Sequence, residues 1–318
     1  MVAEVKRYAR PFSTFADGSE AALRIVELVG EEAGPLIGIT CAVHGNENSG
    51  PQTALELFRR LSMMRLKGRV MILPVANTPA FVANQRFTPL DAQNLNREFP
   101  GNAEGTYTQQ LAAAMCREML DVIDVHFDLH SGGDLCAVDY IAQFPGDQNL
   151  SLLFGTKVVY KPIEGKQGTN FKGMTFSVTV ETRGIPTVGI ELGGGTVDQK
   201  PYVERYVEGV MNMMRALGVI EGEVTPARED QIFINEIGIV RPRHGGWIET
   251  LGPVNGEQVD DEMLLGRIVN PYTFETVEEL RGPFAKGVML MHHPSRNLVQ
   301  PGEYGFLVGN LDGVEGAA

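Results

Sequence analysis

Short apolar runs alternate with longer amphipathic segments over the first 220 residues, and this alternation constrains the fold more than any other feature. The apolar runs cover residues 34–43, 69–76, 122–130 and 185–192. The amphipathic segments between and after them cover residues 49–67, 106–122 and 201–218. Alternating strand and helix patterns of this kind predict an α/β fold, in which helices flank a mixed, mainly parallel sheet.

After about residue 225 the sequence changes to short β-like runs that are interrupted by Gly and Pro. Two halves of this tail look alike, because Val259 and Val299, and likewise Ile268 and Val308, are 40 positions apart. We therefore predict two domains. Residues 1–225 form the larger, catalytic one, and residues 226–318 form a smaller all-β sandwich with pseudo-twofold symmetry.

The repeated half-motif of the tail resembles the barrel-sandwich of the biotinyl/lipoyl-like domains. A carrier role would need a lysine at the hairpin tip that joins the two halves. Residues 268–285 contain no lysine. We therefore interpret the tail as a structural or substrate-gating domain.

The composition argues against several classes of partner. The net charge of −13 disfavours binding to nucleic acid and to an anionic membrane surface. No apolar run approaches the roughly 18 residues that span a bilayer, and residues 1–20 lack the apolar segment of a secretory signal. The three cysteines form no C-x-x-C pair, which favours free thiols and a cytoplasmic location. Both a monomer and a homo-oligomer remain open.

A first polar cluster follows the apolar run 34–43, in the stretch "CAVHGNENSG". His44 and Glu47 are three residues apart, so their side chains point the same way in a tight turn and can bind one metal ion. The best third ligand is His130, which ends the stretch "DVHFDLH". Two histidines and one glutamate leave a coordination position open, as in catalytic zinc sites such as that of carboxypeptidase A.

Other polar residues of the stretch "DVHFDLH" admit two interpretations. Asp128 either orients a metal-binding imidazole or makes a plain structural hydrogen bond. His126 faces the same way as His130, which makes it the strongest candidate for a further role. We nevertheless interpret all four remaining histidines, which are His126, His244, His292 and His293, as structural.

A carboxylate also ends the apolar run 185–192, where Glu191 precedes three glycines. Burial at such a position raises the pKa of a carboxyl group towards the range of a general base. The alternative is a buried ion pair with an arginine such as Arg183. The loop after the run 69–76 supplies Arg86 and Arg97, which suit a carboxylate substrate or a developing oxyanion.

Taken in order, the motifs "HGNE", "NLNREFPG", "DLHSG" and "GIELGGG" resemble those of the succinylglutamate desuccinylase/aspartoacylase family of zinc carboxypeptidase-like hydrolases. The resemblance implies one Zn²⁺ per chain, bound by His44, Glu47 and His130. It also implies that Glu191 is the catalytic base. The remaining roles that it implies are substrate-carboxylate binding by Asn96 and Arg97 and polarisation of the scissile carbonyl by Arg86.

Two departures from the family pattern concern this loop. Asn94 stands where the family often has aspartate, and the spacing from Arg86 to Asn96 differs from that of aspartoacylase. Arg183 matches a further substrate-binding arginine only loosely.

The resemblance implies hydrolysis of the amide bond of a small N-acyl amino acid by a metal-activated water. One alternative is a zinc carboxypeptidase that acts on peptides. Another is a non-catalytic protein that binds a metal or a ligand. The sequence does not distinguish the acyl group or the amino acid of the substrate.

Overall fold

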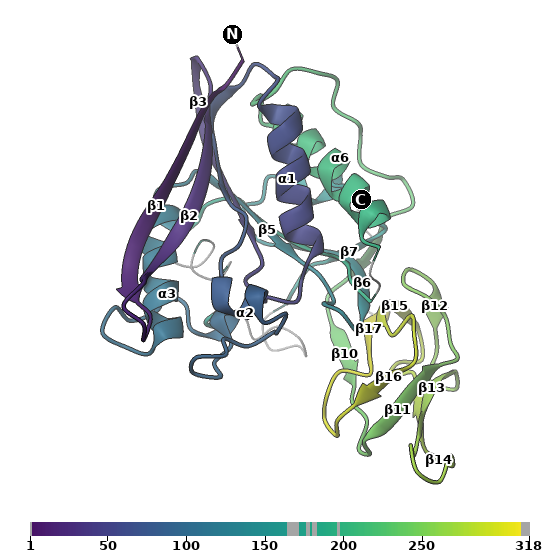
Figure 1. Ribbon diagram of the computed structural model, residues 1–318. Helices are drawn as coiled ribbons and strands as arrows, with labels where there is room; N and C mark the ends of the chain where they lie inside the picture. The colour runs from purple at the N-terminus through teal and green to yellow at the C-terminus, as the bar shows by residue number, and fades with distance from the viewer. Residues whose placement is uncertain (1, 164–171, 176–178, 180–182, 196–197, 313–318) are drawn as a thin grey trace.

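One mixed sheet of 13 strands runs through the computed structural model, which describes residues 2–163, 172–175, 179, 183–195 and 198–312 (Figure 1). Its strands within the first 225 residues are β1 (Glu4–Thr14), β2 (Glu20–Val29), β3 (Glu32–Cys41), β4 (Lys67–Leu73), β5 (Val125–His130), β6 (Ala137–Gln143), β7 (Val158–Tyr160) and β8 (Thr187–Gly193). The strands of the tail are β9 (Ile232–Ile234), β10 (Ile237–Val240), β11 (Gly246–Thr250), β12 (Gln258–Val259), β13 (Leu264–Val269), β14 (Thr276–Arg281), β15 (Gly287–His292), β16 (Asn297–Val299) and β17 (Phe306–Asn310).

The centre of the large sheet is parallel, in the order β4-β3-β5-β8. These four strands are the four apolar runs of the sequence, and the prediction of a mixed sheet is confirmed. The prediction that the sheet is mainly parallel is wrong, because parallel pairing among the described residues is limited to this centre and to β7 with its neighbours β6 and β9. The β1-β2 hairpin and the path from β8 through β6, β15 and β17 to β10 are antiparallel. The hairpin escaped prediction because β1 is a half-exposed edge strand rich in charged residues, without an apolar run.

Helices cover both faces of the sheet, as predicted. Helices α1 (Ser49–Leu61) and α6 (Lys200–Ala216) lie side by side on one face, and α3 (Tyr107–Met115) lies on the other (Figure 1). The predicted helix 106–122 changes at Cys116 into the π-helical turn η2 (Cys116–Leu120), and the helix predicted over 49–67 already ends at Leu61. Short helices within the described residues include α2 (Thr78–Val82), η1 (Leu95–Arg97) and α4 (Leu150–Leu153).

Strand β5 presents different chemistry to the two faces. Val125, Phe127 and Leu129 belong to the apolar core beneath α1 and α6. Successive side chains of a strand point to opposite faces. His126, Asp128 and His130 therefore face the other side, where the loop after β4 passes, and all three are buried. The polar residues predicted from the sequence thus share one face of the central strand.

The pairing of the tail strands repeats itself. Strand β11 pairs with β13 and β16, and in the same way β15 pairs with β17 and β12. The four positions that recur in the sequence, Val259, Val299, Ile268 and Val308, are buried in one apolar cluster. The described part of the tail contains no helix.

Sheet pairing continues across residue 225. Strand β15 pairs with β6 at Met291 and His292, and β9 pairs with β7. The tail also contacts this sheet through Asn255, whose Nδ2 donates to the carbonyl of Ala137 at 2.9 Å. The two predicted domains therefore share one sheet. Among the described residues, no helix has the length and apolar character that crossing a membrane requires.

Candidate metal centre

The turn after β3 brings His44 and Glu47 together. A side chain at Gly45 would come within 2.0 Å of the backbone carbon of Ala80, so only glycine lets this turn pack against α2. The Nδ1 atom of His44 lies 2.7 Å from Oε1 of Glu47. Both side chains are only 2% exposed, so these polar groups are withdrawn from water and need partners inside the protein.

His130, the last residue of β5, completes the cluster. Its Nδ1 lies 3.0 Å from Oε2 of Glu47, so the carboxylate lies between the two imidazoles. One ligand atom from each of the three residues can be chosen so that all lie within 4.8 Å of one another. In the described part of the chain, this is the one group of three or more such side chains close enough to hold a metal ion.

The outer nitrogens of the two imidazoles indicate which atoms face the centre. Nε2 of His130 lies 3.0 Å from Oδ2 of Asp128. Nε2 of His44 lies 3.1 Å from Oδ1 of Asn94, and this oxygen also accepts a hydrogen bond from the backbone N–H of Asn96. Each Nε2–H therefore donates outward, which points the Nδ1 lone pair at the Glu47 carboxylate. A cation would satisfy this inward-facing set of acceptors, and the residues present therefore fit a metal ion.

The pKa values show how the metal-free cluster balances charge. Burial, followed by the charge of Arg86, lowers the pKa of His44 to about 4, against the opposing effect of Glu47. Burial also lowers the pKa of His130, but Asp128 and Glu47 outweigh it and hold that pKa well above its ordinary value. Burial raises the pKa of Glu47, yet the two histidines bring it below its usual range. A protonated His130 thus supplies the positive charge that a bound metal ion would supply.

Glu191 lies beside this cluster. It pairs with His130 across the β5-β8 ladder, so the two side chains leave the same face of the sheet. Strand β8 is otherwise buried, and Glu191 is its one partly exposed residue. Burial raises the pKa of Glu191 to about 8. The charge of His130 opposes this rise, and the charge of Glu47 adds to it. A carboxyl group with such a pKa suits proton transfer near neutral pH.

Arg183 does not pair with Glu191. Its guanidinium contacts Asp121 at 2.7 Å, before the start of β5, whereas His130 lies at the other end of that strand. The alternative of a structural Arg183–Glu191 ion pair is therefore wrong. A substrate-binding role for Arg183 is not supported either.

The loop after β4 brings its polar residues to the same region. Nη1 of Arg86 lies 3.3 Å from Oε1 of Glu47. Oδ1 of Asn96 accepts hydrogen bonds from the backbone and the hydroxyl of Thr175, at 2.8 and 2.9 Å, which fixes the orientation of the side-chain amide. Partial burial and the charge of Arg86 lower the pKa of Arg97, which contacts no carboxylate among the described residues. Two neighbouring guanidinium groups favour an anionic ligand.

Helix α3 anchors this loop. The carboxylate of Asp91 accepts hydrogen bonds from the backbone and the hydroxyl of Thr108, at 2.8 and 2.7 Å. Thr108 lies in the first turn of α3, where the helix dipole favours a negative charge. The loop that carries Arg86 and Arg97 is therefore fixed to a regular element.

The structure also shows residues that the sequence analysis missed or left open. Asp128 contacts Nε2 of His130 at 3.0 Å, as expected of a residue that orients this imidazole. His126 contacts Thr40 Oγ1 at 2.9 Å and Thr179 Oγ1 at 3.3 Å, and is not among the three clustered residues. Tyr140 lies directly opposite Glu191 in the β6-β8 ladder. Its stretch "AVDYIAQ" looks like an ordinary strand, and only the strand register places it beside Glu191.

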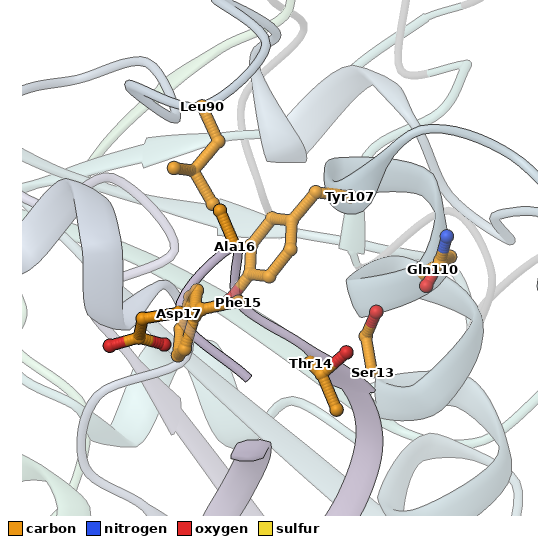
Figure 2. A pocket seen from close by; sticks show the side chains of 8 residues that line it. All are labelled: Ser13, Thr14, Phe15, Ala16, Asp17, Leu90, Tyr107 and Gln110. Carbon is orange, nitrogen blue, oxygen red and sulfur yellow. The ribbon is translucent and has the colours of Figure 1, made fainter. Parts of the chain in front are cut away.

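A pocket of about 530 Å³ lies elsewhere, between the β1-β2 turn and α3 (Figure 2). Phe15 and Tyr107 stack in its wall with their ring centres 5.7 Å apart, and Leu90 forms another part of the wall. None of the metal-centre residues lines it. We therefore assign the chemistry to the cluster around Glu47 rather than to this pocket.

Comparisons with known proteins show the family of the chain. Residues 33–217 match the model of the succinylglutamate desuccinylase/aspartoacylase catalytic domain. The N-alpha-acetyl-L-2,4-diaminobutyric acid deacetylase of Halomonas elongata is 31% identical over 265 residues, which are 81% of this chain and 77% of that protein.

Solved structures resemble the chain over nearly its whole length. The product-bound ectoine utilization protein of Ruegeria pomeroyi is 26% identical, with a TM-score of 0.83 over 98% of this chain and 96% of that chain. A succinylglutamate desuccinylase from Silicibacter sp. is also 26% identical, with a TM-score of 0.83 and the same coverage of 98% and 96%. The chain belongs to the succinylglutamate desuccinylase/aspartoacylase family.

Proposed function

We propose that the chain is a zinc-dependent hydrolase that cleaves the amide bond of a small N-acyl amino acid. His44, Glu47 and His130 would hold one zinc ion. The observation that carries this proposal is the convergence of two imidazole Nδ1 atoms on Glu47, with the raised-pKa carboxyl of Glu191 beside them. Three protein ligands leave a position open for water or substrate, as catalytic zinc requires.

Zinc supplies Lewis acidity and a water of lowered pKa when it is bound. Glu191 accepts the proton of the attacking water and returns it to the leaving amine. Arg86 donates to the carbonyl oxygen as negative charge develops there. Its guanidinium carries five N–H donors, so its contact with Glu47 leaves others free. Arg97, with the amide nitrogen of Asn96, binds the substrate carboxylate.

The substrate class follows from the two arginines and from the relatives. A free carboxylate on the substrate satisfies Arg97, and an N-acylated amino acid provides one. The deacetylase of Halomonas elongata acts on an N-acetylated diamino acid. N-acetyl-2,4-diaminobutyrate is therefore the first substrate that we propose for this chain.

A substrate panel tests the proposal. N-acetyldiaminobutyrate, N-acetylaspartate, N-succinylglutamate and a set of dipeptides would be assayed with the zinc-loaded protein, with release of the free amine as the readout. We expect turnover of at least one acyl amino acid and little turnover of dipeptides. Preference for the dipeptides would favour the carboxypeptidase alternative. Binding without turnover of any compound would favour a non-catalytic binding protein.

We further propose that residues 226–318 form a barrel-sandwich-like unit beside the catalytic part in residues 1–225. The support is the recurring strand pairing and the shared apolar cluster of the tail. We also propose a cytoplasmic location. All three cysteines are buried and unpaired, which suits a reducing compartment.

A further inference from the structure

Tyr206 contacts the two strands that carry the proposed chemistry, from the opposite face of the sheet. It lies in α6, and its side chain is fully buried. Its hydroxyl donates a hydrogen bond to the backbone carbonyl of His130 and lies 3.3 Å from the carbonyl of Ile190. One phenol group thus contacts the metal-ligand residue itself and the residue before the proposed base.

These two carbonyls lie where the β5-β8 ladder ends. His130 and Glu191 form the last pair of that ladder, and the chain leaves β5 directly afterwards. A buried carbonyl without a donor costs about 1–3 kcal/mol, so the end of a buried ladder needs a hydrogen-bond donor from elsewhere. The Tyr206 hydroxyl is that donor, and its position ties the ends of two adjacent strands together.

We propose that Tyr206 is a positioning residue that sets the separation between His130 and Glu191. The predicted effect on metal affinity requires only that His44, Glu47 and His130 bind an ion. The predicted effect on the rate rests on the proposed function. The side chains of His130 and Glu191 leave the face opposite α6, so a shift of either strand end changes their relative placement. A misplacement of about 1 Å at a reacting group can lower a rate by about a hundredfold.

A second hydrogen bond holds β8 alone. Oγ of Ser49, at the start of α1, donates to the carbonyl of Leu192 at 3.2 Å. Leu192 follows Glu191, and in the described part of the chain the hydroxyl of Ser49 makes no hydrogen bond with β5. The two hydroxyls therefore separate the effects. Tyr206 acts on the ligand strand and the base strand, and Ser49 acts on the base strand only.

The ordinary alternative is that Tyr206 is a core residue whose hydroxyl merely needs a partner. Both interpretations expect Tyr206→Phe to lower the thermal stability. They differ in whether the metal affinity and the rate change at temperatures where the variant is fully folded. Measurements of these quantities decide between them.

The experiment compares Tyr206→Phe with Ser49→Ala and with the control Tyr202→Phe in the full-length protein. Tyr202 lies four residues earlier in α6, so the control also removes one tyrosine hydroxyl from this helix. Zinc affinity would be measured by competition with a chromophoric chelator, without substrate. The kinetic constants kcat and KM would be measured with the best acyl amino acid of the panel, and Tm by thermal unfolding.

We expect Tyr206→Phe to weaken zinc binding about tenfold, as the loss of outer contacts to metal ligands does. We expect its kcat to fall about tenfold or more, with KM changed by less than about threefold. Ser49→Ala should lower kcat but keep the wild-type zinc affinity. Tyr202→Phe should resemble the wild type in both quantities.

Wild-type zinc affinity and kcat in folded Tyr206→Phe, with a lowered Tm, would overturn the inference. If that variant does not fold, Ser49→Ala decides, because an unchanged kcat would show that the strand ends need no such fixing. A wild-type protein that binds zinc but hydrolyses no acyl amino acid would refute the proposed function. The comparison of zinc affinities would still test Tyr206 in that case.

Discussion

Glu47 receives more polar contacts than any other residue of the metal centre. Its two carboxylate oxygens contact His44, His130, the guanidinium of Arg86 and the backbone N–H of Ser131. Such a fully engaged carboxylate orients both imidazoles as well as offering an oxygen to a metal ion. Glu191, by contrast, has an open side and a raised pKa. The roles that we propose for the two glutamates therefore differ because the surroundings of the two carboxyl groups differ.

The variant Glu191→Gln tests this division of roles. We expect it to bind zinc as the wild type does, because Glu191 is not one of the three clustered ligands. We expect its kcat to fall by about 10²- to 10⁴-fold, the usual contribution of a general acid–base group. Steady-state kinetics and metal analysis provide the two readouts. The matched variant Glu47→Gln should lose zinc and activity together, and full activity of Glu191→Gln would remove Glu191 from the mechanism.

Arg97 offers a second test at this scale. We expect Arg97→Ala to raise KM for an acyl amino acid by about 10- to 100-fold, because it removes a hydrogen bond to a charged group. The control is Arg183→Ala, whose guanidinium pairs with Asp121 at the far end of β5. That variant should keep the wild-type KM. Equal KM values for Arg97→Ala and the wild type would show that Arg97 does not bind the substrate.

Among the elements, β5 carries the polar row that connects the metal centre with the sheet interior. His126 lies on this row and is held by Thr40 from β3 and by Thr179. Burial lowers the pKa of His126 to about 4. The charge of Asp128 opposes this decrease, and the charge of His130 adds to it. As the pH falls, His126 of the unfolded chain takes up a proton near pH 6.5, whereas His126 of the folded protein stays neutral down to about pH 4. Protonation therefore favours unfolding as the pH falls from about 6.5 to about 4.

We therefore predict that His126→Gln weakens the acid sensitivity of the metal-free protein. Between about pH 7 and pH 5, the wild type should lose about 2 kcal/mol of unfolding free energy through this histidine. The variant lacks the titrating group and should lose correspondingly less. Urea unfolding at the two pH values measures the difference. An identical pH dependence in both proteins would show that His126 is not held neutral by burial.

The sequence predicted best those elements whose pattern can be read from residues close together in the chain. The four central strands are continuous apolar runs, and α1 and α6 have apolar residues at helical spacing. The proximity of His44, Glu47 and His130 was predictable because they lie at or shortly after strand ends. The π-helical turn at Cys116, the place of Tyr140 beside Glu191 and the Tyr206 hydrogen bond were not predictable. Each depends on register or packing between distant segments, which leaves no local pattern.

At the scale of the whole molecule, the tail completes the sheet that carries the metal centre. Strands β15 and β9 cover the edges of β6 and β7, and β6 in turn pairs with β8 beside Glu191. The tail also has its own apolar cluster, which includes Ile248, Ile268 and Phe306. It is therefore a unit with its own core that nevertheless contributes strands to the sheet.

This arrangement predicts that a chain ending at residue 225 is not an active enzyme. Removal of β9 and β15 leaves β6 and β7 with exposed backbone edges, which favours aggregation over a folded monomer. Size-exclusion chromatography and zinc-dependent activity of the truncated chain measure the outcome. A soluble fragment with wild-type activity would show that the tail is dispensable for the catalytic centre.

The most direct test of the central claim is metal removal and restoration with N-acetyl-2,4-diaminobutyrate as substrate. Chelator-treated protein should lose hydrolysis, and activity should return in proportion to added zinc until one ion is bound per chain. The variant His130→Ala should regain neither bound zinc nor activity under the same treatment. Undiminished hydrolysis of acyl amino acids by protein that holds no divalent metal ion would contradict the account.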